Sequence, residues 1–327
     1  MVTSDTPLVS VVTPVYQGEN FLAECIESVL KQTYQNWEHV ILDNASTDAS
    51  FEIAQHYAAK DSRIRAHRNE RTHGVVRNHN MALGLMVGES KYCKVLQADD
   101  ILFPQCLEQM VSVAEAHPSV GLVGSYNLHG TRLACDGLPF PSTVIGGREL
   151  ARLTLLGALY LFLSPSSLLI RAEHIRARPD FYPGDDLHAD VAACYEVMKV
   201  SDFGFVHQVL TFIRRHSASL TSSQSLPFNT FIWSNTALLL KYGPTYLSPE
   251  EYEARLKWQL TAYRRFLAMN ILRGHHPRGF WQYHRRGLRQ LGYPLKITDL
   301  AKTLVKGVAL EGIGFVVDHG RPPLAKL

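Results

Sequence analysis

Apolar runs alternate with helix-spaced segments over the first two thirds of the chain. The continuous β-branched run at residues 8–15 is typical of a buried strand, and further strands are predicted at residues 37–42, 64–67, 92–96, 120–126 and 203–213. Helical spacing of apolar side chains predicts helices at residues 21–32, 50–60, 76–87, 104–116 and 189–199. Strands that alternate with helices in this way predict a doubly wound, mostly parallel α/β sheet.

The pattern changes beyond Ser217. Residues 217–225 are rich in Ser and Thr, which is typical of a linker. Helices are predicted after it at residues 228–242, 249–273, 278–291 and 297–310. We therefore expect one domain over residues 1–220 and a helical region over residues 221–327.

Two stretches of the first domain depart from the strand–helix alternation. Residues 127–147 are rich in Gly and Pro and are predicted to form a loop. The segment from Leu153 to Ile170 is uncharged and long enough to imitate a membrane-spanning helix. Gly157 and the stretch 164–167, which contains a proline, interrupt it, so a buried helix, a turn and a buried strand explain it better.

Composition adds an asymmetry of charge to this picture. The chain has 327 residues, is 46% hydrophobic and 19% charged, and carries a formal charge of +3, as an ordinary globular protein does. From Leu226 onwards there are 15 Lys and Arg against 6 Asp and Glu, whereas residues 1–225 have 18 against 24. Residues 1–225 are therefore acidic overall, and residues 226–327 form a basic tail.

The number and spacing of the cysteines indicate the cellular compartment in which the protein works. The five cysteines show neither a CxxC pair nor a metal-ligand spacing: Cys25, Cys93, Cys106, Cys135 and Cys194. An odd number without a visible targeting segment predicts a reducing, cytoplasmic location, which can include the inner face of the membrane.

Two adjacent carboxylates, Asp99 and Asp100, follow the predicted strand at residues 92–96. In an open α/β sheet ligands bind where strands end. Two neighbouring carboxylates there suit a hard divalent cation on a phosphate. The alternative is that they cap the helix that opens near Pro104. The stretch by itself does not separate the two interpretations.

Other strand ends also carry polar or aromatic residues. Tyr16 follows the first strand and could stack on a nucleobase, or be an ordinary half-buried aromatic. Asp43 ends the second strand and could accept hydrogen bonds from a base or ribose, whereas Asp48 is better explained as a helix cap. Arg77 opens a helix and could meet a diphosphate, or be solvated. Neither a Walker P-loop nor a GxGxxG motif is present, so a nucleotide would be held by such side chains.

Taken in order, these elements resemble a family 2 glycosyltransferase of GT-A fold. The resemblance rests on residues 9–19 (VSVVTPVYQGE), 28–34 (SVLKQTY), 43–48 (DNASTD), 77–78 (RN) and 97–100 (QADD). It covers about residues 8–216. It implies an α/β fold with a Rossmann-like mixed sheet, to which a helical C-terminal appendage is added.

The resemblance also implies an activity and a set of roles. The activity is inverting transfer of a sugar from a nucleotide-diphosphate donor, usually a UDP-sugar, with Mg²⁺ or Mn²⁺ as cofactor. Tyr16 and Asp43 would hold the base, and Arg77 would lie near the nucleotide. Asp99 would face the ribose or sugar, and Asp100 would bind the cation. Further donor-site positions implied by the resemblance are Pro14, Glu19 and Arg214.

Inversion also requires a base that deprotonates the acceptor hydroxyl from the opposite side of the sugar. The family places this carboxylate in a Glu-Asp pair at the start of a helix. Ala189-Asp190 stands there, so Asp190 is the candidate base, with a helix cap as its alternative. Asp185 and Asp186 lie upstream and are weaker substitutes.

One more matching residue, His216, and three positions that differ from the family's pattern complete the comparison. His216 falls in a segment like the family's Arg-x-His, where the histidine could bind the cation or donate to phosphate. Asn44 stands where the family often has a second Asp. Gln97 replaces the first Asp of the metal motif with a neutral, weaker ligand, and Ala189 replaces the Glu before the base.

The basic tail and the acceptor leave several alternatives. Arginines interleave with aromatic residues between residues 258 and 289, so the tail could lie on anionic headgroups and reach a lipid-linked acceptor. It could instead be a helical subdomain that packs its aromatics on the catalytic body or on a second subunit of a homo-oligomer, with solvated arginines. Nucleic acid is not expected as a partner, because none of its binding motifs accompanies the charge. For the whole chain, the expected activity serves cell-surface polysaccharide synthesis with a saccharide or lipid-linked acceptor, and the alternative is a non-catalytic nucleotide-sugar binding module.

Overall fold

The strands predicted in the first hundred residues form one half of a ten-stranded sheet within the described part of the computed structural model. The structure describes residues 6–301 and 303, apart from residues 163, 185, 275 and 297. The chain divides into two units. The first comprises residues up to 151 and residues 159–215, and the second comprises residues 152–158 and those from 216 onwards.

The strands are β1 (Val9–Val15), β2 (Trp37–Asp43), β3 (Ile64–Arg68), β4 (Tyr92–Val95), β5 (Ile101–Leu102), β6 (Val120–His129), β7 (Arg132–Ala134), β8 (Val144–Ile145), β9 (Leu169–Arg171) and β10 (Asp202–Ile213). Their order in the sheet is β3-β2-β1-β4-β9-β6-β10-β5, and β7 and β8 pair with β6 and β10. β1 to β4 are mutually parallel. β9 is antiparallel to both β4 and β6, and β10 is parallel to β6. The sheet is therefore mixed, and β1, β2, β4, β6 and β10 all end at one edge.

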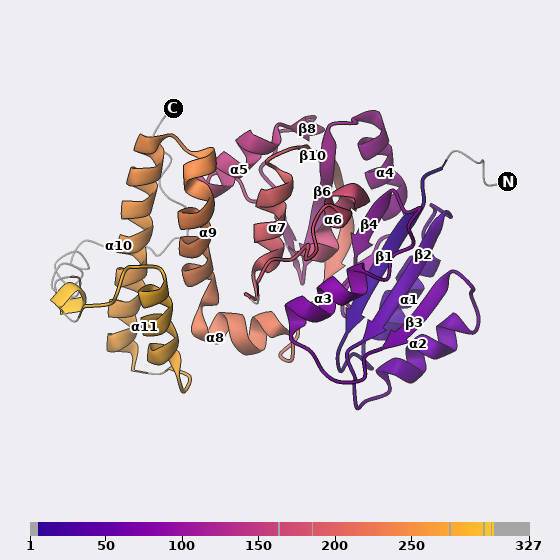
Figure 1. Ribbon diagram of the computed structural model, residues 1–327, viewed down its shortest axis with the longest axis horizontal. Coiled ribbons are helices and arrows are strands. Elements are labelled where there is room, and N and C mark those ends of the chain that lie inside the picture. Colours follow the sequence, from indigo (N-terminus) through magenta and orange to yellow (C-terminus); the bar gives the residue numbers. More distant parts are fainter. Residues whose placement is uncertain are drawn as a thin grey trace. The chain divides into compact units, whose positions relative to one another are not determined.

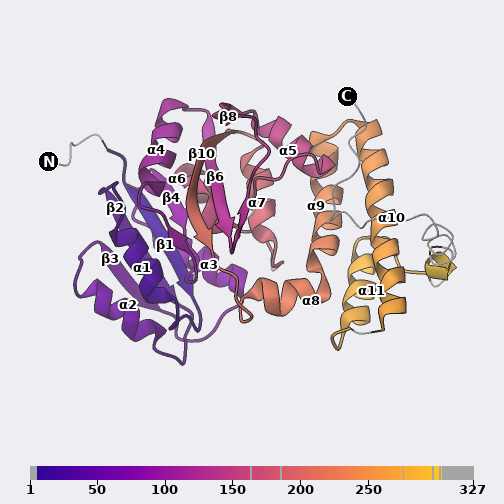
Figure 2. The same cartoon turned by 180° about the vertical axis from the view of Figure 1, so that it is seen from behind.

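Helices cover both faces of this sheet. They are α1 (Leu22–Leu30), α2 (Ser50–Ala58), α3 (Val75–Leu83), α4 (Cys106–Ala116), α5 (Gly147–Leu156), the short 3-10 helix η1 (Pro165–Ser167), α6 (Ala172–Arg176) and α7 (Ala189–Val197). Figure 1 shows α3, α6 and α7 on one face, and the reverse view in Figure 2 shows α1 and α2 on the other. The predicted α/β alternation is confirmed.

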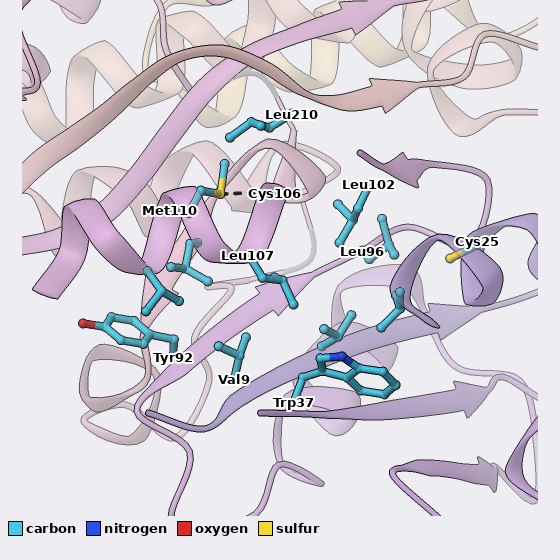
Figure 3. Close-up of a cluster of buried hydrophobic side chains, with 14 of the residues drawn as sticks. Val9, Cys25, Trp37, Tyr92, Leu96, Leu102, Cys106, Leu107, Met110 and Leu210 are labelled. Carbon is cyan, nitrogen blue, oxygen red and sulfur yellow. Dashed lines mark hydrogen bonds between the residues drawn. The ribbon is translucent and has the colours of Figure 1, made fainter. Parts of the chain in front are cut away.

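The main hydrophobic core lies between the sheet and α1, α2 and α4. Leu107 and Met110 of α4 are fully buried there together with Val9, Trp37 and Leu96 from three different strands or strand ends (Figure 3). Strands buried on both faces explain why their sequences are continuously apolar rather than alternating. The core fixes α4 and the strands that carry the site.

Replacing Leu107 by alanine is expected to lower the free energy of unfolding by about 2–5 kcal/mol, because a fully buried leucine leaves a cavity. Urea unfolding followed by circular dichroism measures this. Leu133→Ala is the matched control, since Leu133 is 51% exposed and should cost less than about 0.5 kcal/mol. Equal losses for the two variants would mean that Leu107 is not a core residue.

Two expectations about the middle of the chain have different outcomes. The predicted loop at residues 127–147 is wrong in part, because β6 continues to His129 and pairs with β7, and β8 pairs with β10. Strands of two or three residues carry too little pattern to be predicted. The segment from 153 to 170 holds the end of α5, then η1 and β9, as expected for a helix, a turn and a strand. In the described residues, none of the helices combines the length and hydropathy needed to span a bilayer.

The second unit is helical. Its helices are α8 (Leu226–Phe228), α9 (Thr230–Tyr246), α10 (Pro249–Arg273) and α11 (Phe280–Gln290), preceded by a π-helical turn η2 (Thr221–Ser225). α10 begins at a capping box between Ser248 and Glu251, which explains its sharp start. Most of the predicted helix at residues 297–310 lies outside the described residues.

The aromatic residues of the basic tail mostly build the unit's own core. Tyr263 and Phe280 are buried in it, and Trp281 and Phe266 pack against it. The Tyr263 hydroxyl hydrogen-bonds His284 at 2.7 Å inside this core. These aromatics therefore pack within the second unit itself, which neither alternative specified, whereas the arginines of α11 remain exposed.

Candidate active site

The loops after β1 and β2 hold each other at the carboxyl edge of the sheet. The backbone N–H of Glu19 donates to Asp48 at 3.0 Å, and the N–H of Ala49 donates to the Glu19 carboxylate at 3.1 Å. Gln17 accepts a hydrogen bond from the Thr47 N–H at 3.0 Å. Asp48 also accepts from the Ser50 N–H at 3.1 Å, but it stands one residue before Ala49, the N-cap of α2, so it supports the start of the helix without being its cap residue. Glu19 likewise contacts the start of α2.

This pair of loops presents an aromatic ring. Pro14 is buried within β1, and Tyr16 directly after the strand is 56% exposed. Between Tyr16 and α1, Gly18 leaves no room for a side chain, because a Cβ there would lie 2.6 Å from Val15. The turn therefore stays tight and the Tyr16 ring remains open to a planar ligand.

Asp43 is a fully buried carboxylate at the end of β2. One of its oxygens accepts from the Ser46 N–H at 3.0 Å and lies 3.3 Å from Nε of Arg68. Its other oxygen, Oδ1, is buried without a hydrogen-bond partner among the described residues. A buried acceptor in this state costs free energy unless a ligand supplies a donor. Asp43 is thus prepared to accept an N–H or O–H from a bound molecule.

Asn44 has a different task from Asp43. Its amide group donates to the His73 carbonyl at 2.9 Å, and its amide oxygen accepts from the His73 N–H at 2.9 Å. The same oxygen accepts from Asn69 at 3.0 Å, and Asn69 also donates to Asn78 of α3 at 2.8 Å. Only an amide both donates and accepts in this way, which explains why the position is not an aspartate.

Asn44→Asp, which restores the acid usual in the resembled family, is expected to destabilise the protein by about 1–3 kcal/mol. A carboxylate would face the His73 carbonyl without the N–H that now bridges them. Thermal unfolding at neutral pH measures the loss. Asn36→Asp is the control, because Asn36 is at the surface and donates only to the Thr6 carbonyl. A stabilised Asn44→Asp variant would contradict this account.

α3 connects three parts of the site. Arg77 is exposed near its start, and among the described residues no ion pair or hydrogen bond holds its guanidinium. Asn80 and Tyr182 exchange two hydrogen bonds, of 2.8 and 2.9 Å. His79 packs edge-on against the Tyr182 ring at 5.9 Å. The helix therefore presents a cation to solvent while its other side anchors the segment before α7.

Gln97, at the first position of the carboxylate motif, is bound to His79. Nδ1 of His79 lies 2.8 Å from the Val75 carbonyl, so this nitrogen carries the proton. Nε2 then accepts from the Gln97 amide at 2.9 Å. Burial lowers the pKa of His79, which keeps the ring neutral and this arrangement intact. Gln97 thus has a structural partner inside the site.

Asp100 is buried at the turn after β4. Oδ1 accepts from the Arg214 N–H at 3.0 Å, and the Ser166 hydroxyl lies near enough to the carboxylate to lower its pKa. Burial, and then the charge of Asp99, raise the pKa of Asp100 well above that of an ordinary aspartate. A nearby divalent cation would favour the ionised form of both carboxylates.

Arg214, the residue after β10, contacts the turn that holds Asp99 and Asp100. Its Nε donates to the Asp99 carbonyl at 3.0 Å, and its terminal nitrogen pairs with Glu24 of α1. The guanidinium also lies 4.8 Å from the Phe21 ring. Arg214 therefore fixes the carboxylate turn to α1, and within the site its contacts are with protein groups.

Asp190 lies in the first turn of α7, in a small and mainly apolar pocket. The pocket is lined by Leu122, Phe162, Ser164, Pro165, Leu168, Ile170, Phe181, Tyr182, Asp190 and Cys194. Asp190 Oδ1 accepts from the Val191 N–H at 2.9 Å. Burial raises the pKa of Asp190 to about 7. Its carboxyl group can therefore exchange a proton near neutral pH.

The two carboxylate sites flank the short segment from Ser164 to Ser166. Ser164 and Pro165 line the Asp190 pocket, and Ser166, fully buried, accepts from the Gln97 N–H at 3.0 Å and reaches Asp100. Sequence reasoning treated this segment only as an interruption. Its serines and the proline were the visible signal, but their partners lie far away in the chain.

The remaining predicted residues are less constrained. His216 belongs to the second unit, so its role at the cation stays a prediction. Asp185 lies outside the described residues, and Asp186 accepts from the His188 N–H at 2.9 Å as a local cap. Among the described residues, no group of three or more His, Cys, Asp or Glu side chains could enclose a metal ion.

Sequence comparison relates the first part of the chain to a known family. Residues 10–135 match a family model described as Glycosyl transferase family 2. The putative glycosyltransferase EpsE of Bacillus subtilis is 35% identical over 149 residues, which are 43% of this chain and 52% of EpsE. The chain spans only 39% and 52% of the length of the first two curated relatives that it matches.

Solved structures extend the likeness of the fold over most of the chain. S. aureus TarS 1-349 in complex with UDP has a TM-score of 0.60 at 16% identity, covering 92% of this chain and 82% of that one. The mannosyltransferase PcManGT from Pyrobaculum calidifontis, in complex with GDP-Man and Mn²⁺, has a TM-score of 0.56 at 15% identity and covers 95% of this chain and 82% of its own. The predicted GT-A fold with a helical C-terminal region is confirmed.

Proposed function

We propose that this chain, whose residues 10–135 belong to glycosyl transferase family 2, is an inverting transferase that uses a UDP-sugar. The acceptor is a hydroxyl of a saccharide or lipid-linked glycan, as in cell-surface polysaccharide synthesis. One observation carries the proposal. The carboxylate pair Asp99–Asp100 and the carboxyl group of Asp190 flank the short segment from Ser164 to Ser166, which is hydrogen-bonded to Gln97 after β4. A donor diphosphate and an acceptor hydroxyl need two such groups on opposite sides of the reacting carbon.

The donor base would lie between Tyr16 and Asp43. The exposed Tyr16 ring offers a face for stacking, and the unpaired Oδ1 of Asp43 accepts the imide N–H that uracil presents. Arg77, exposed on α3, supplies a guanidinium for the diphosphate. The structurally similar TarS 1-349 was crystallised in complex with UDP, which supports a uridine donor.

The oxygen-only donor set at the turn after β4 fits Mg²⁺ or Mn²⁺. Such cations often take one or two carboxylates from the protein and their other ligands from phosphate and water. Asp100 would hold the ion, with Asp99 beside it turned toward the donor. Gln97 would contribute little, because its amide is bound to His79. When bound, the ion offsets the negative charge that builds on the departing diphosphate.

Asp190 is the proposed general base. In the transfer, the acceptor oxygen forms a bond to the anomeric carbon while the bond from that carbon to the diphosphate oxygen breaks. Asp190 takes the acceptor's proton, and the configuration at the carbon inverts. A carboxyl pKa near 7 lets the group accept a proton more readily than an ordinary aspartate does.

A panel assay tests the proposal. The full chain is incubated with UDP-sugars and GDP-sugars in the presence of Mn²⁺, with and without saccharide and polyprenyl-linked acceptors, and free nucleotide is measured. We expect UDP release that acceptors stimulate and that chelation of the cation abolishes. Binding of UDP without turnover over the whole panel would instead support the alternative of a non-catalytic binding module. The neutral Gln97 in the carboxylate motif suggests that alternative. Turnover of GDP-sugars alone would overturn the uridine assignment.

A further inference from the structure

The second unit contains an open pocket of about 390 Å³ between α9 and α11. Its lining residues are Trp233, Gly279, Gln282, Tyr283, Arg286, Gly287 and Gln290. Trp233 comes from α9 and lies directly over Gly287, where a Cβ would approach the indole to 2.5 Å. Because position 287 has no side chain, the indole ring of Trp233 can pack directly against α11.

The pocket lies in the most basic stretch of the chain. From residue 254 to residue 298 the sequence has ten Lys and Arg and no Asp or Glu. Arg285, Arg286 and Arg289 are all exposed on α11, and of these only Arg286 lines the pocket. In the described part of the chain, the salt bridges include none to Arg286. Its guanidinium is available to an anionic ligand.

The lining supplies hydrogen-bond donors at a regular spacing. Gln282, Arg286 and Gln290 are four residues apart, so they line one face of α11. Amide and guanidinium N–H groups are the donors that phosphate oxygens accept, and the pocket contains no carboxylate that would compete. The aromatic rings of Trp233 and Tyr283 can cover the carbon atoms next to a phosphate.

Exposed apolar side chains on the same unit point to a lipid as the source of that phosphate. Leu226, Phe231, Ile271 and Leu272 are exposed. A helical unit that combines exposed apolar side chains with exposed arginines is typical of proteins that lie on an anionic membrane surface, whereas a site for free phosphate needs no apolar side chains.

We propose that the pocket formed by Trp233 and α11 binds the phosphate of an anionic phospholipid headgroup and so holds the protein at a membrane surface. Arg286 is the specific contact, and the other arginines of α11 add general attraction. This function needs neither donor sugar nor cation. A failure of membrane binding would therefore leave the proposed transferase activity untouched, and the reverse is also true.

Sedimentation of the full chain with lipid vesicles tests the proposal. One set of vesicles is phosphatidylcholine alone, and the other contains one third phosphatidylglycerol. Arg289→Gln is the matched control, since Arg289 is on the same helix but outside the pocket. We expect binding only to the anionic vesicles, a loss of about fivefold for Arg289→Gln, and a loss at least about tenfold larger for Arg286→Gln. Arg286→Lys, which keeps the charge without the forked donor, should fall between them and also serves if the glutamine variant folds poorly.

Three results would overturn the proposal. The first is no salt-sensitive binding of the unmodified chain to anionic vesicles. The second is an equal loss for Arg286→Gln and Arg289→Gln, which would leave only general electrostatic attraction. The third is binding of inorganic phosphate in solution, lost in Arg286→Gln, without any binding to vesicles, which would identify a site for a soluble phosphate.

Discussion

Replacing Asp190 by asparagine is expected to slow sugar transfer by about 10²–10⁴-fold, the usual contribution of a positioned general base. The amide cannot take the acceptor's proton, but it can still accept the Val191 N–H that Asp190 now accepts. The fold and the affinity for UDP should therefore remain close to those of the unmodified chain. Initial rates of nucleotide release and a titration with UDP separate the two effects.

The pH profile adds a second readout of the same residue. Because burial raises the pKa of Asp190 to about 7, the carboxylate forms only as the pH rises through that value. Transfer should increase about tenfold per pH unit below 7 and level off above it, and this slope should vanish in Asp190→Asn. Glu196→Gln is the matched control, since Glu196 lies on the same helix and pairs with Lys199. A wild-type rate in Asp190→Asn would remove it as the base.

Asp100→Asn should reduce transfer by about 10³-fold, because a cation at a departing diphosphate stabilises several kcal/mol of developing charge. An asparagine can still accept the Arg214 N–H, so the turn should keep its shape. Relaxation of water protons by Mn²⁺, measured with UDP present, reports the loss of cation affinity directly. Asp61→Asn removes an acid that pairs with Arg63 and should leave both quantities unchanged. Full cation affinity in Asp100→Asn would assign the ion to other residues.

Much of the sheet and half of the site follow from local patterns. The apolar runs of β1, β2 and β4 predict strands because parallel strands are buried on both faces. Polar residues at the ends of these runs, such as Tyr16, Asp43 and Asp100, then fall at the ligand-binding edge. α10 has the predicted ends because a capping box and Gly274 define them. These features depend on neighbours in the sequence, so the sequence contains them.

Other features depend on partners that lie far away in the chain. The direction of β9 follows from its pairing with β4 and β6, which its three residues cannot indicate. Ser166 acquires its role from Gln97, 69 residues earlier. Arg214 carries the charge that suits a diphosphate, but its side chain contacts Asp99 and Glu24, and the Glu19 carboxylate accepts from the start of α2. Long-range hydrogen bonds of this kind are visible only once the chain is folded.

The pair formed by Gln97 and His79 makes two positions interdependent. His79 offers a lone pair at Nε2 because its other nitrogen is committed to the Val75 carbonyl. An acid at position 97 would require a second proton on His79 and hence a buried imidazolium, which burial disfavours, and an apolar residue would leave Nε2 unpaired. Adding an acid beside Asp99 and Asp100 would therefore also change the charge of His79. We expect homologous chains with an acid at position 97 to carry a different residue at position 79.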